Sequence, residues 1–333
     1  MILRMFSCKT FLLFIAASTV LFTGCASKLP ESAFVSPDAR PLLLAHRGIS
    51  QTFNHAGVNN DTCTAMRINS PTHTILENTL SSMVAAIAAG ADVIEIDIHP
   101  TLDGQFAVFH DWTLECRTNG SGRTRDFTMA QLKQLDIGYG YSADGGKTFP
   151  FRGKTKESMP SLADVLQQFP DLRILINIKS NDLIEGQQLA AYLNGLSSQR
   201  RALIAVYGGD KAVQAVRDNT KDIITMSKNG LKACLISYVV MGWTGQVPSS
   251  CEKTLILLPL NFTNWIWGWP NRFVERMGSI GSAVFVLGPY SGGPSTGIDD
   301  LEALKQLPPN YTGGIWTNEI ELISRALKRI KPQ

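Results

Sequence analysis

Three short segments carry side chains that could do chemistry together: His46-Arg47-Gly48, Glu95-Ile96-Asp97 and His110-Asp111. Carboxylates two positions apart on a strand point to the same side. Among apolar neighbours they repel each other and lose hydration, and a divalent cation that prefers oxygen ligands, Ca²⁺ or Mg²⁺, offsets both costs. An arginine can hold a phosphate bidentately, and two histidines can serve as general base and general acid. The pattern predicts metal-assisted chemistry on a phosphate.

A turn signal predicts how the third segment approaches the second. Asp103-Gly104 is typical of a two-residue hairpin turn. With such a turn Leu102 faces Gln105, and counting back places Asp97 opposite His110. Directly opposed side chains lie about 5 Å apart at Cβ. We therefore expect a histidine beside the two carboxylates.

The elements that must position these residues alternate along the chain. Short apolar runs rich in β-branched residues are typical of parallel strands buried on both faces, and helix-like stretches lie between them. Eight such strands favour a TIM (β/α)₈ barrel, whose active site lies at the carboxyl ends of the strands. A doubly wound open sheet is the alternative, but no glycine-rich phosphate loop follows the first strand. The predicted strands are 42–46, 93–98, 174–178, 203–207, 223–226, 255–260, 283–287 and 314–317, and the predicted helices include 79–89, 161–169, 183–196, 211–218, 298–307 and 320–330.

Two long segments do not follow this alternation. Residues 49–76 form a polar stretch after the first strand, and residues 114–159 contain a short helix candidate near 128–135 and an aromatic, glycine-rich run. Both leave from carboxyl ends of predicted strands, and long loops in a compact domain are usually functional or disordered. We expect insertions at the catalytic face.

The N-terminus predicts export and anchoring. Arg4 and Lys9 precede the apolar run Phe11–Phe22, which is too short to span a bilayer and fits a signal peptide. The run leads into a sequence resembling a bacterial lipobox that ends at Cys25, and no aspartate follows, which indicates the outer membrane. We expect a signal peptide over 1–24, lipidation of Cys25, a linker over 25–40, and a barrel over 41–333 facing the periplasm.

Composition narrows the partners. The formal net charge is only +3 and there is no basic block, so nucleic acid is not an expected partner. Beyond the anchor region the cysteines are Cys63, Cys116, Cys234 and Cys251, which fit an oxidising compartment and allow three pairings. Cys234–Cys251 would close a short loop, and Cys63–Cys116 would join the two expected insertions. No C-x-x-C motif indicates a thiolate metal site.

The same segments resemble the signature of the glycerophosphodiester phosphodiesterases. To the three segments above the sequence adds Glu77-Asn78-Thr79 and Thr101-Leu102-Asp103-Gly104, and the likeness continues to Thr317-Asn318. It implies a phosphatidylinositol-phospholipase-C-like barrel, a divalent cation, and hydrolysis of small glycerophosphodiesters to glycerol 3-phosphate and an alcohol. Carried over by position, the catalytic pair is His46 and His110, the phosphate ligands are Arg47 and Lys179, and the metal ligands are Glu95 and Asp97.

One position departs from the family pattern. The family commonly has glutamate two residues before the lysine, whereas this chain has Asn177 before Lys179. An asparagine can still offer a carbonyl oxygen to Ca²⁺ or Mg²⁺, but it removes one negative charge. We expect Asn177 as a third metal ligand in a site that binds metal more weakly, binds another metal, or is completed by water. Glu77 is expected beside the site, and Asn78 is expected to cap the first helix.

Three alternatives remain at this stage. A lysophospholipase-D-like or sphingomyelinase-D-like enzyme on the same barrel would suit the tryptophan-rich segment 265–270, which follows the strand 255–260 at the catalytic face. A catalytically silent binding lipoprotein would suit Asn177. A sugar-phosphate isomerase or aldolase barrel is disfavoured, because neither pairs these three segments.

Overall fold

The computed structural model describes residues 32–38, 40–59 and 61–330. The predicted signal peptide and Cys25 lie outside these residues. Within the described part, no helix combines the length and the apolar character needed to cross a bilayer.

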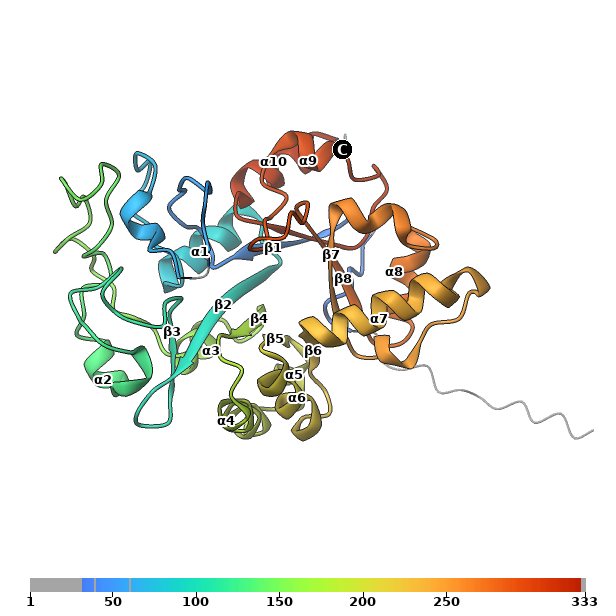
Figure 1. The fold of residues 1–333 in the computed structure, drawn as a ribbon, viewed down its shortest axis with the longest axis horizontal. Helices are drawn as coiled ribbons and strands as arrows, with labels where there is room; N and C mark the ends of the chain where they lie inside the picture. The colour runs from blue at the N-terminus through green and yellow to red at the C-terminus, as the bar shows by residue number, and fades with distance from the viewer. Residues whose placement is uncertain (1–31, 39, 60, 331–333) are drawn as a thin grey trace, which may run out of the picture.

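Eight parallel strands form a nearly closed barrel (Figure 1). Their order is β6-β5-β4-β2-β1-β9-β8-β7, and a single parallel bridge between Thr225 and Thr254 connects the two outer strands β6 and β7. This confirms the predicted (β/α)₈ architecture and every predicted strand to within two residues at each end. The strands are β1 (Leu42–His46), β2 (Val93–Pro100), β4 (Arg173–Ile178), β5 (Ile204–Gly208), β6 (Ile224–Ser227), β7 (Leu255–Pro259), β8 (Ala283–Leu287) and β9 (Gly314–Thr317).

The helices surround this barrel, and most begin at a side-chain cap. Thr79, Ser161 and Asp300 each accept a hydrogen bond from a backbone N–H of the first helical turn. The predicted helix over 298–307 is shorter in the structure because Asp300 caps it. The sequence pattern did not predict α5, α7 or α8. The helices are α1 (Leu80–Ala89), α2 (Met129–Leu132), α3 (Leu162–Gln168), α4 (Leu183–Asn194), α5 (Ser198–Ala202), α6 (Asp210–Asn219), α7 (Lys228–Met241), α8 (Asn271–Gly278), α9 (Leu301–Lys305) and α10 (Ile320–Ile330).

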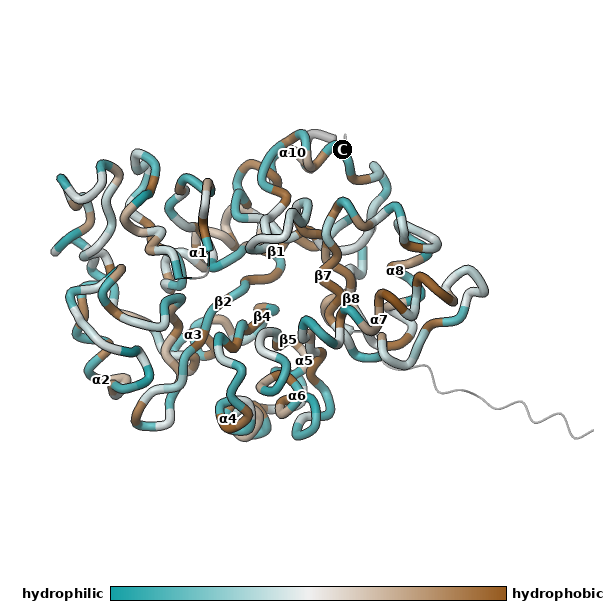
Figure 2. Tube along the Cα trace, viewed as in Figure 1, coloured by the Kyte–Doolittle hydropathy of each residue, from teal (hydrophilic) through white to brown (hydrophobic). Residues whose placement is uncertain are grey.

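The apolar core has two layers, because each parallel strand buries both of its faces. One layer lies between the strands and the surrounding helices, and the other fills the barrel interior. Figure 2 shows β7 and β8 as brown, apolar strands at the centre of the molecule. Phe34 packs with the interior residues Leu42 and Val93 near the amino ends of their strands. The interior is therefore solid at that end, and polar side chains gather at the other.

The two predicted insertions pack against each other at the carboxyl ends of the strands. They share a small apolar core that includes Ala65, Leu114, Tyr141 and Phe151. A disulfide between Cys63 and Cys116 joins them, with Cα atoms 5.5 Å apart. The second disulfide, Cys234–Cys251, lies between α7 and the segment before β7, with Cα atoms 4.7 Å apart. Of the three possible pairings, the structure thus contains the one that links the insertions.

The β2–β3 hairpin differs from the prediction by one residue. β3 (Phe106–Val108) pairs antiparallel with β2, and Pro100 lies opposite Phe106. The loop between them has three residues beyond the Thr101–Gln105 pair, and Gly104 supplies the left-handed conformation at φ 75°. The predicted two-residue turn is therefore wrong, and Asp97 lies opposite Phe109, whose N–H donates to its carbonyl. His110 is the next residue after Phe109 and lies beyond the end of β3.

Candidate active site

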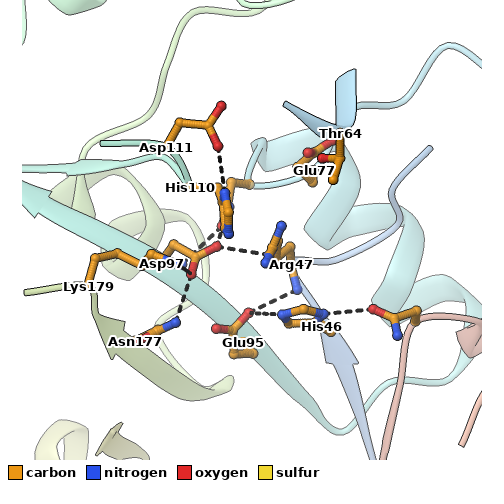
Figure 3. Close-up of polar contacts among 12 residues, drawn as sticks. His46, Arg47, Thr64, Glu77, Glu95, Asp97, His110, Asp111, Asn177 and Lys179 are labelled. Carbon is orange, nitrogen blue, oxygen red and sulfur yellow. Dashed lines mark hydrogen bonds and ion pairs between the residues drawn. The ribbon is translucent and has the colours of Figure 1, made fainter. Parts of the chain in front are cut away.

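The site begins where β1 ends. His46 is paired with Glu95 of β2 in the barrel register. The chain then turns through Arg47 and Gly48, both with positive φ. A Cβ atom on Gly48 would lie 2.5 Å from the side-chain oxygen of Ser82 and 2.8 Å from its carbonyl group, so only glycine fits against α1 here. This close approach aims the side chains of His46 and Arg47 at the carboxyl end of β2 (Figure 3).

Glu95 lies on the floor of the site and is fully buried. One carboxylate oxygen accepts a hydrogen bond from the hydroxyl of Tyr207 at 2.7 Å. The other accepts from the backbone N–H of Arg47 at 3.2 Å and lies 3.8 Å from Nε2 of His46. Tyr207 of β5 and the turn after β1 therefore fix this carboxylate from two sides.

Asp97 is also fully buried and is the most heavily contacted carboxylate in the site. It accepts hydrogen bonds from the amides of Asn78 at 3.0 Å and Asn177 at 2.9 Å. Nε of Arg47 lies 3.0 Å from one oxygen, and Nζ of Lys179 lies 3.5 Å from the other. Three other segments of the chain thus converge on one side chain, and Figure 3 shows two of them, one at Arg47 and one at Asn177 and Lys179.

The two carboxylates differ in their preferred charge. Burial, and then the negative charge of Asp97, raise the pKa of Glu95 above its ordinary value. Burial also opposes ionisation of Asp97, but the positive charges of Arg47 and Lys179 outweigh it and hold the pKa of Asp97 well below its ordinary value. The protein's own cations thus stabilise one full negative charge here and leave the second under-compensated.

His46 is held in one tautomer. Its Nδ1 lies 2.7 Å from the amide oxygen of Asn318. The amide nitrogen of Asn318 donates to Asp299 at 2.7 Å, which leaves its oxygen free to accept. Nδ1 of His46 must therefore carry the proton, and Nε2 presents a lone pair to the site. Burial, and then the charge of Arg47, lower the pKa of His46 to about 3, so the ring is neutral near pH 7.

His110 is also neutral with its proton on Nδ1, but a different residue accepts that proton's hydrogen bond. Its Nδ1 donates to the carboxylate of Asp111 at 2.6 Å, so Nε2 is again the free nitrogen. Burial, and then the charge of Arg47, lower the pKa of His110 to about 4. His99, a buried residue of β2, has its Nε2 3.3 Å from the carbonyl oxygen of His110. Two neutral imidazoles therefore present Nε2 at the end of the barrel.

Arg117 anchors the support of His110. Its guanidinium pairs with Asp111 and donates to Glu77 at 2.9 Å and to Thr64 at 2.8 Å. The hydroxyl of Tyr141 donates to the second oxygen of Glu77 at 2.9 Å. Arg117 directly follows the disulfide residue Cys116, and its side chain is 3% exposed. A buried ion network between the two insertions thus holds Asp111 against His110.

The predicted residues lie together, with one correction. His46, Arg47, Glu95, Asp97, His110, Asn177 and Lys179 surround one point, and Glu77 contacts it through Arg117 (Figure 3). Asn78 does not cap α1: Thr79 does, because its side chain accepts from the N–H of Ser82. Asn78 instead adopts a left-handed conformation at φ 57° and hydrogen-bonds both the carboxylate and the N–H of Asp97.

Other members of the site were not predicted. Tyr207, Asn318 and Arg117 bind Glu95, His46 and Asp111, respectively. Tyr207 and Asn318 lie at the ends of β5 and β9, so their place after predicted strands was the available signal. Arg117 carries no such signal, because it lies in an insertion.

The donor set fits a hard divalent cation. Glu95 and Asp97 supply carboxylate oxygens, and the raised pKa of Glu95 shows that one more positive charge would stabilise the pair. No group of three His, Cys, Asp or Glu side chains within the described residues is arranged to hold a metal. The amide of Asn177, the third predicted ligand, turns its nitrogen toward Asp97 in this structure.

Comparisons with known proteins found chains of similar sequence and of similar fold. Glycerophosphodiester phosphodiesterases of Caldanaerobacter subterraneus and Bacillus subtilis are 37% and 33% identical to this chain over 31% and 49% of its length. The matched parts span 39% and 47% of those two relatives. A phosphodiesterase of Oleispira antarctica, solved with the product sn-glycerol-3-phosphate, shares the fold with a TM-score of 0.52 at 16% identity, over 87% of this chain and 96% of that one.

A family model covers more of the chain than either of these two relatives does. The model of the glycerophosphoryl diester phosphodiesterase family matches residues 46–228, from the first histidine of the site to the start of α7. That range is more than half of the chain and includes every site residue described above except Asp299 and Asn318. The chain belongs to the glycerophosphoryl diester phosphodiesterase family.

Proposed function

We propose that this protein hydrolyses glycerophosphodiesters to glycerol 3-phosphate and an alcohol with the help of a divalent cation. The observation that carries the proposal is the pair of neutral histidines, His46 and His110, with free Nε2 atoms above two buried carboxylates and two cationic side chains. The activity named for the relatives and the product bound to the Oleispira antarctica structure support the same reaction class.

The residues divide the work in this proposal. Arg47 and Lys179 bind the non-bridging oxygens of the phosphodiester, since their charged groups lie beside Asp97 at the end of the barrel. One histidine accepts a proton through Nε2 from the glycerol 2-hydroxyl as it attacks phosphorus, and the other donates a proton to the leaving alcohol oxygen. Water then opens the resulting cyclic phosphate to give glycerol 3-phosphate. The negative charge of a bound phosphodiester would raise the pKa of the nearer ring and so favour its protonated form.

Glu95 and Asp97 would hold the cation, Ca²⁺ or Mg²⁺, and Asn177 would join them if its amide turned to present oxygen. When bound, the cation would neutralise charge that builds on the phosphate oxygens. Glu77 would act at one remove, because it holds Arg117, which holds Asp111. The substrate in this proposal is a small water-soluble molecule.

The test measures release of choline from glycerophosphocholine, with glycerol 3-phosphate as the other product, and from lysophosphatidylcholine, which still carries an acyl chain. We expect release from glycerophosphocholine by the purified protein and none by His46→Ala. Choline release from lysophosphatidylcholine alone, with lysophosphatidic acid as the other product, would instead support a lysophospholipase D. Binding of glycerophosphocholine without turnover would support a silent binding protein.

We also propose that the protein is exported and anchored to the outer membrane through lipid on Cys25, facing the periplasm. The sequence of the N-terminal segment supports this address. Two disulfides in the barrel fit the oxidising compartment that export would reach. Cys25→Ser should move the protein from the membrane fraction to the soluble fraction, as read by fractionation and by loss of labelled fatty acid. Unchanged fractionation and labelling would exclude the anchor.

A further inference from the structure

Helix α7 is apolar yet scarcely buried. Over Lys228–Met241 its only buried residues are Cys234 and Tyr238. Ile236 and Val240 of the same helix are 55% and 71% exposed. Figure 2 shows brown stretches along this helix, at the edge of the molecule. A helix that is apolar on most faces is normally covered, so this one lacks a cover among the described residues.

A second segment, the tryptophan-rich residues 265–270, lies against the end of this helix. Nε1 of Trp267 donates to the carbonyl of Val239 at 2.8 Å, and the hydroxyl of Tyr238 donates to the carbonyl of Trp267 at 2.9 Å. Trp265 is 70% exposed and Trp267 is 48% exposed. Trp243, which follows α7, is 67% exposed. We call the exposed set the tryptophan surface: Ile236, Val239, Val240, Trp243, Trp265 and Trp267.

This surface has the chemistry of a membrane interface. No Asp, Glu, Lys, Arg or His occurs in residues 233–251 or 254–271, the two segments that supply it. Exposed apolar patches without charge mark interaction sites, and tryptophan prefers the boundary between lipid headgroups and acyl chains. Three of the six tryptophans in the sequence lie here with their rings exposed.

The tryptophan surface lies on one side of the barrel. Cys234 of α7 is bonded to Cys251, four residues before β7 begins, and Arg276 of α8 donates to the carbonyl of Gly242 at 2.8 Å. In Figure 1, α7 and α8 lie at the end of the molecule opposite β3 and α2. The tryptophan-rich segment begins just after the carboxyl end of β7, as predicted, and continues against α7 on the side of the barrel away from β3 and α2.

The first described residues of the chain lie beside α8, on this same side of the barrel. Val35 lies against Gly278 at the end of α8, whose Cβ would be 3.7 Å from a methyl group of Val35. Ser32 follows Cys25 by seven positions, and an extended chain of that length spans at most about 25 Å. A lipid anchor on Cys25 would thus keep this end of the barrel close to a bilayer.

We infer that the tryptophan surface docks on a phospholipid bilayer. Docking does not require the proposed activity, because none of the residues of the surface belongs to the site around Glu95 and Asp97.

The experiment uses the exported protein, purified as the cell processes it, with vesicles of phosphatidylethanolamine and phosphatidylglycerol whose acyl chains are brominated. Bromine quenches tryptophan fluorescence only at short range. We expect strong quenching in the wild type. Replacing Trp243, Trp265 and Trp267 together by Phe should remove most of it, whereas Trp112→Phe should not, although Trp112 is 41% exposed.

A charge on the surface should also break the contact. Val240→Asp should reduce quenching, whereas Ile184→Asp on α4 should not, because Ile184 is 55% exposed but lies outside the tryptophan surface. Hydrolysis of glycerophosphocholine should be the same in both variants, which separates failure of docking from failure of the proposed function. Absence of quenching in the wild type, or its loss in Trp112→Phe, would overturn the inference. So would a dimer in sedimentation that Val240→Asp dissociates, because a second copy would then cover the surface.

Discussion

The two histidines of the site occupy equivalent states on very different supports. His46 ends a barrel strand, and the ladder between β1 and β2 sets its position beside Glu95. His110 lies beyond the end of β3, and an ion network through Asp111, Arg117 and Glu77 sets its position. One half of the site is therefore positioned by backbone pairing and the other half by buried charges and a disulfide between insertions.

The barrel strands and the insertions therefore position the site residues in different ways. Parallel strands hold Glu95 and Asp97 in place, because β2 pairs with β4 over residues 93–98 and with β1 over residues 93–95. The His110 half has no such ladder, so its geometry depends on a few side chains. We expect changes in the insertions to alter catalysis while leaving the barrel folded, and changes in the strand half to act on the chemistry directly.

The largest effect should come from the histidines themselves. His46→Ala and His110→Ala should each lower turnover of a glycerophosphodiester by about 10²- to 10⁴-fold, the usual contribution of general acid–base help. Both side chains are partly exposed at strand ends, so thermal unfolding should change little. Near-normal turnover of either folded variant would remove it from the proton-transfer pair.

The next effect should come from Arg117. Removal of one partner of a buried ion pair typically costs about 3–5 kcal/mol, because the other charges stay buried and unpaired. Arg117→Ala should lower kcat and increase hydrogen exchange in residues 114–159 more than in β1, β2 and β4. Arg125→Ala is the matched control, since Arg125 pairs with Glu185 but is 44% exposed. Equal effects of the two variants would contradict the anchoring role of Arg117.

The two disulfides offer a smaller test of the same comparison. Cys63–Cys116 closes a separation of 53 residues and Cys234–Cys251 one of 17, so loop entropy predicts similar losses of about 3–4 kcal/mol on removal. Replacing Cys63 and Cys116 by Ala should lower kcat at a temperature where both variants are folded. Replacing Cys234 and Cys251 should not. Equal losses of kcat after removal of either disulfide would contradict a special role of Cys63–Cys116 in positioning His110.

The smallest effect concerns Asn177 in the strand half. A carboxylate binds a divalent cation more strongly than an amide oxygen does, because it contributes a full charge. Asn177→Glu should lower the metal concentration needed for half-maximal activity, and a raised KM would show that the new carboxylate also pairs with Lys179. Activity measured against Ca²⁺ and Mg²⁺ distinguishes the two effects. Identical metal dependence in both proteins would place Asn177 outside the coordination shell.

The same comparison explains what could be predicted from the sequence. The strands were predicted because buried parallel strands are continuous apolar, β-branched runs. The strand residues of the site followed, since carboxyl ends of neighbouring strands meet at one rim. The register of the β2–β3 hairpin was missed by one residue, because Asp-Gly also suits a three-residue loop in which Gly104 is left-handed. Asn78 was misassigned because the adjacent Thr79 is an equally good cap.

The rest depends on tertiary contacts that no local pattern specifies. Arg117 joins Glu77 and Asp111 across separations of 40 and 6 residues, and Asn318 reaches His46 from the far end of the chain. The exposure of α7 could not be predicted either, because a helix as apolar as this one is normally buried. These residues were found only when the barrel brought distant segments together.

The most direct test of the whole account is metal dependence of hydrolysis. Glycerol 3-phosphate release from glycerophosphocholine is measured for the purified protein before chelation, after chelation with EDTA and dialysis, and after addition of Ca²⁺ or Mg²⁺. The account predicts loss of release on chelation and recovery with at least one of the two ions, while Asp97→Ala stays inactive throughout. Hydrolysis at full rate in the chelated protein would contradict it, because the buried carboxylates would then have no cation to hold.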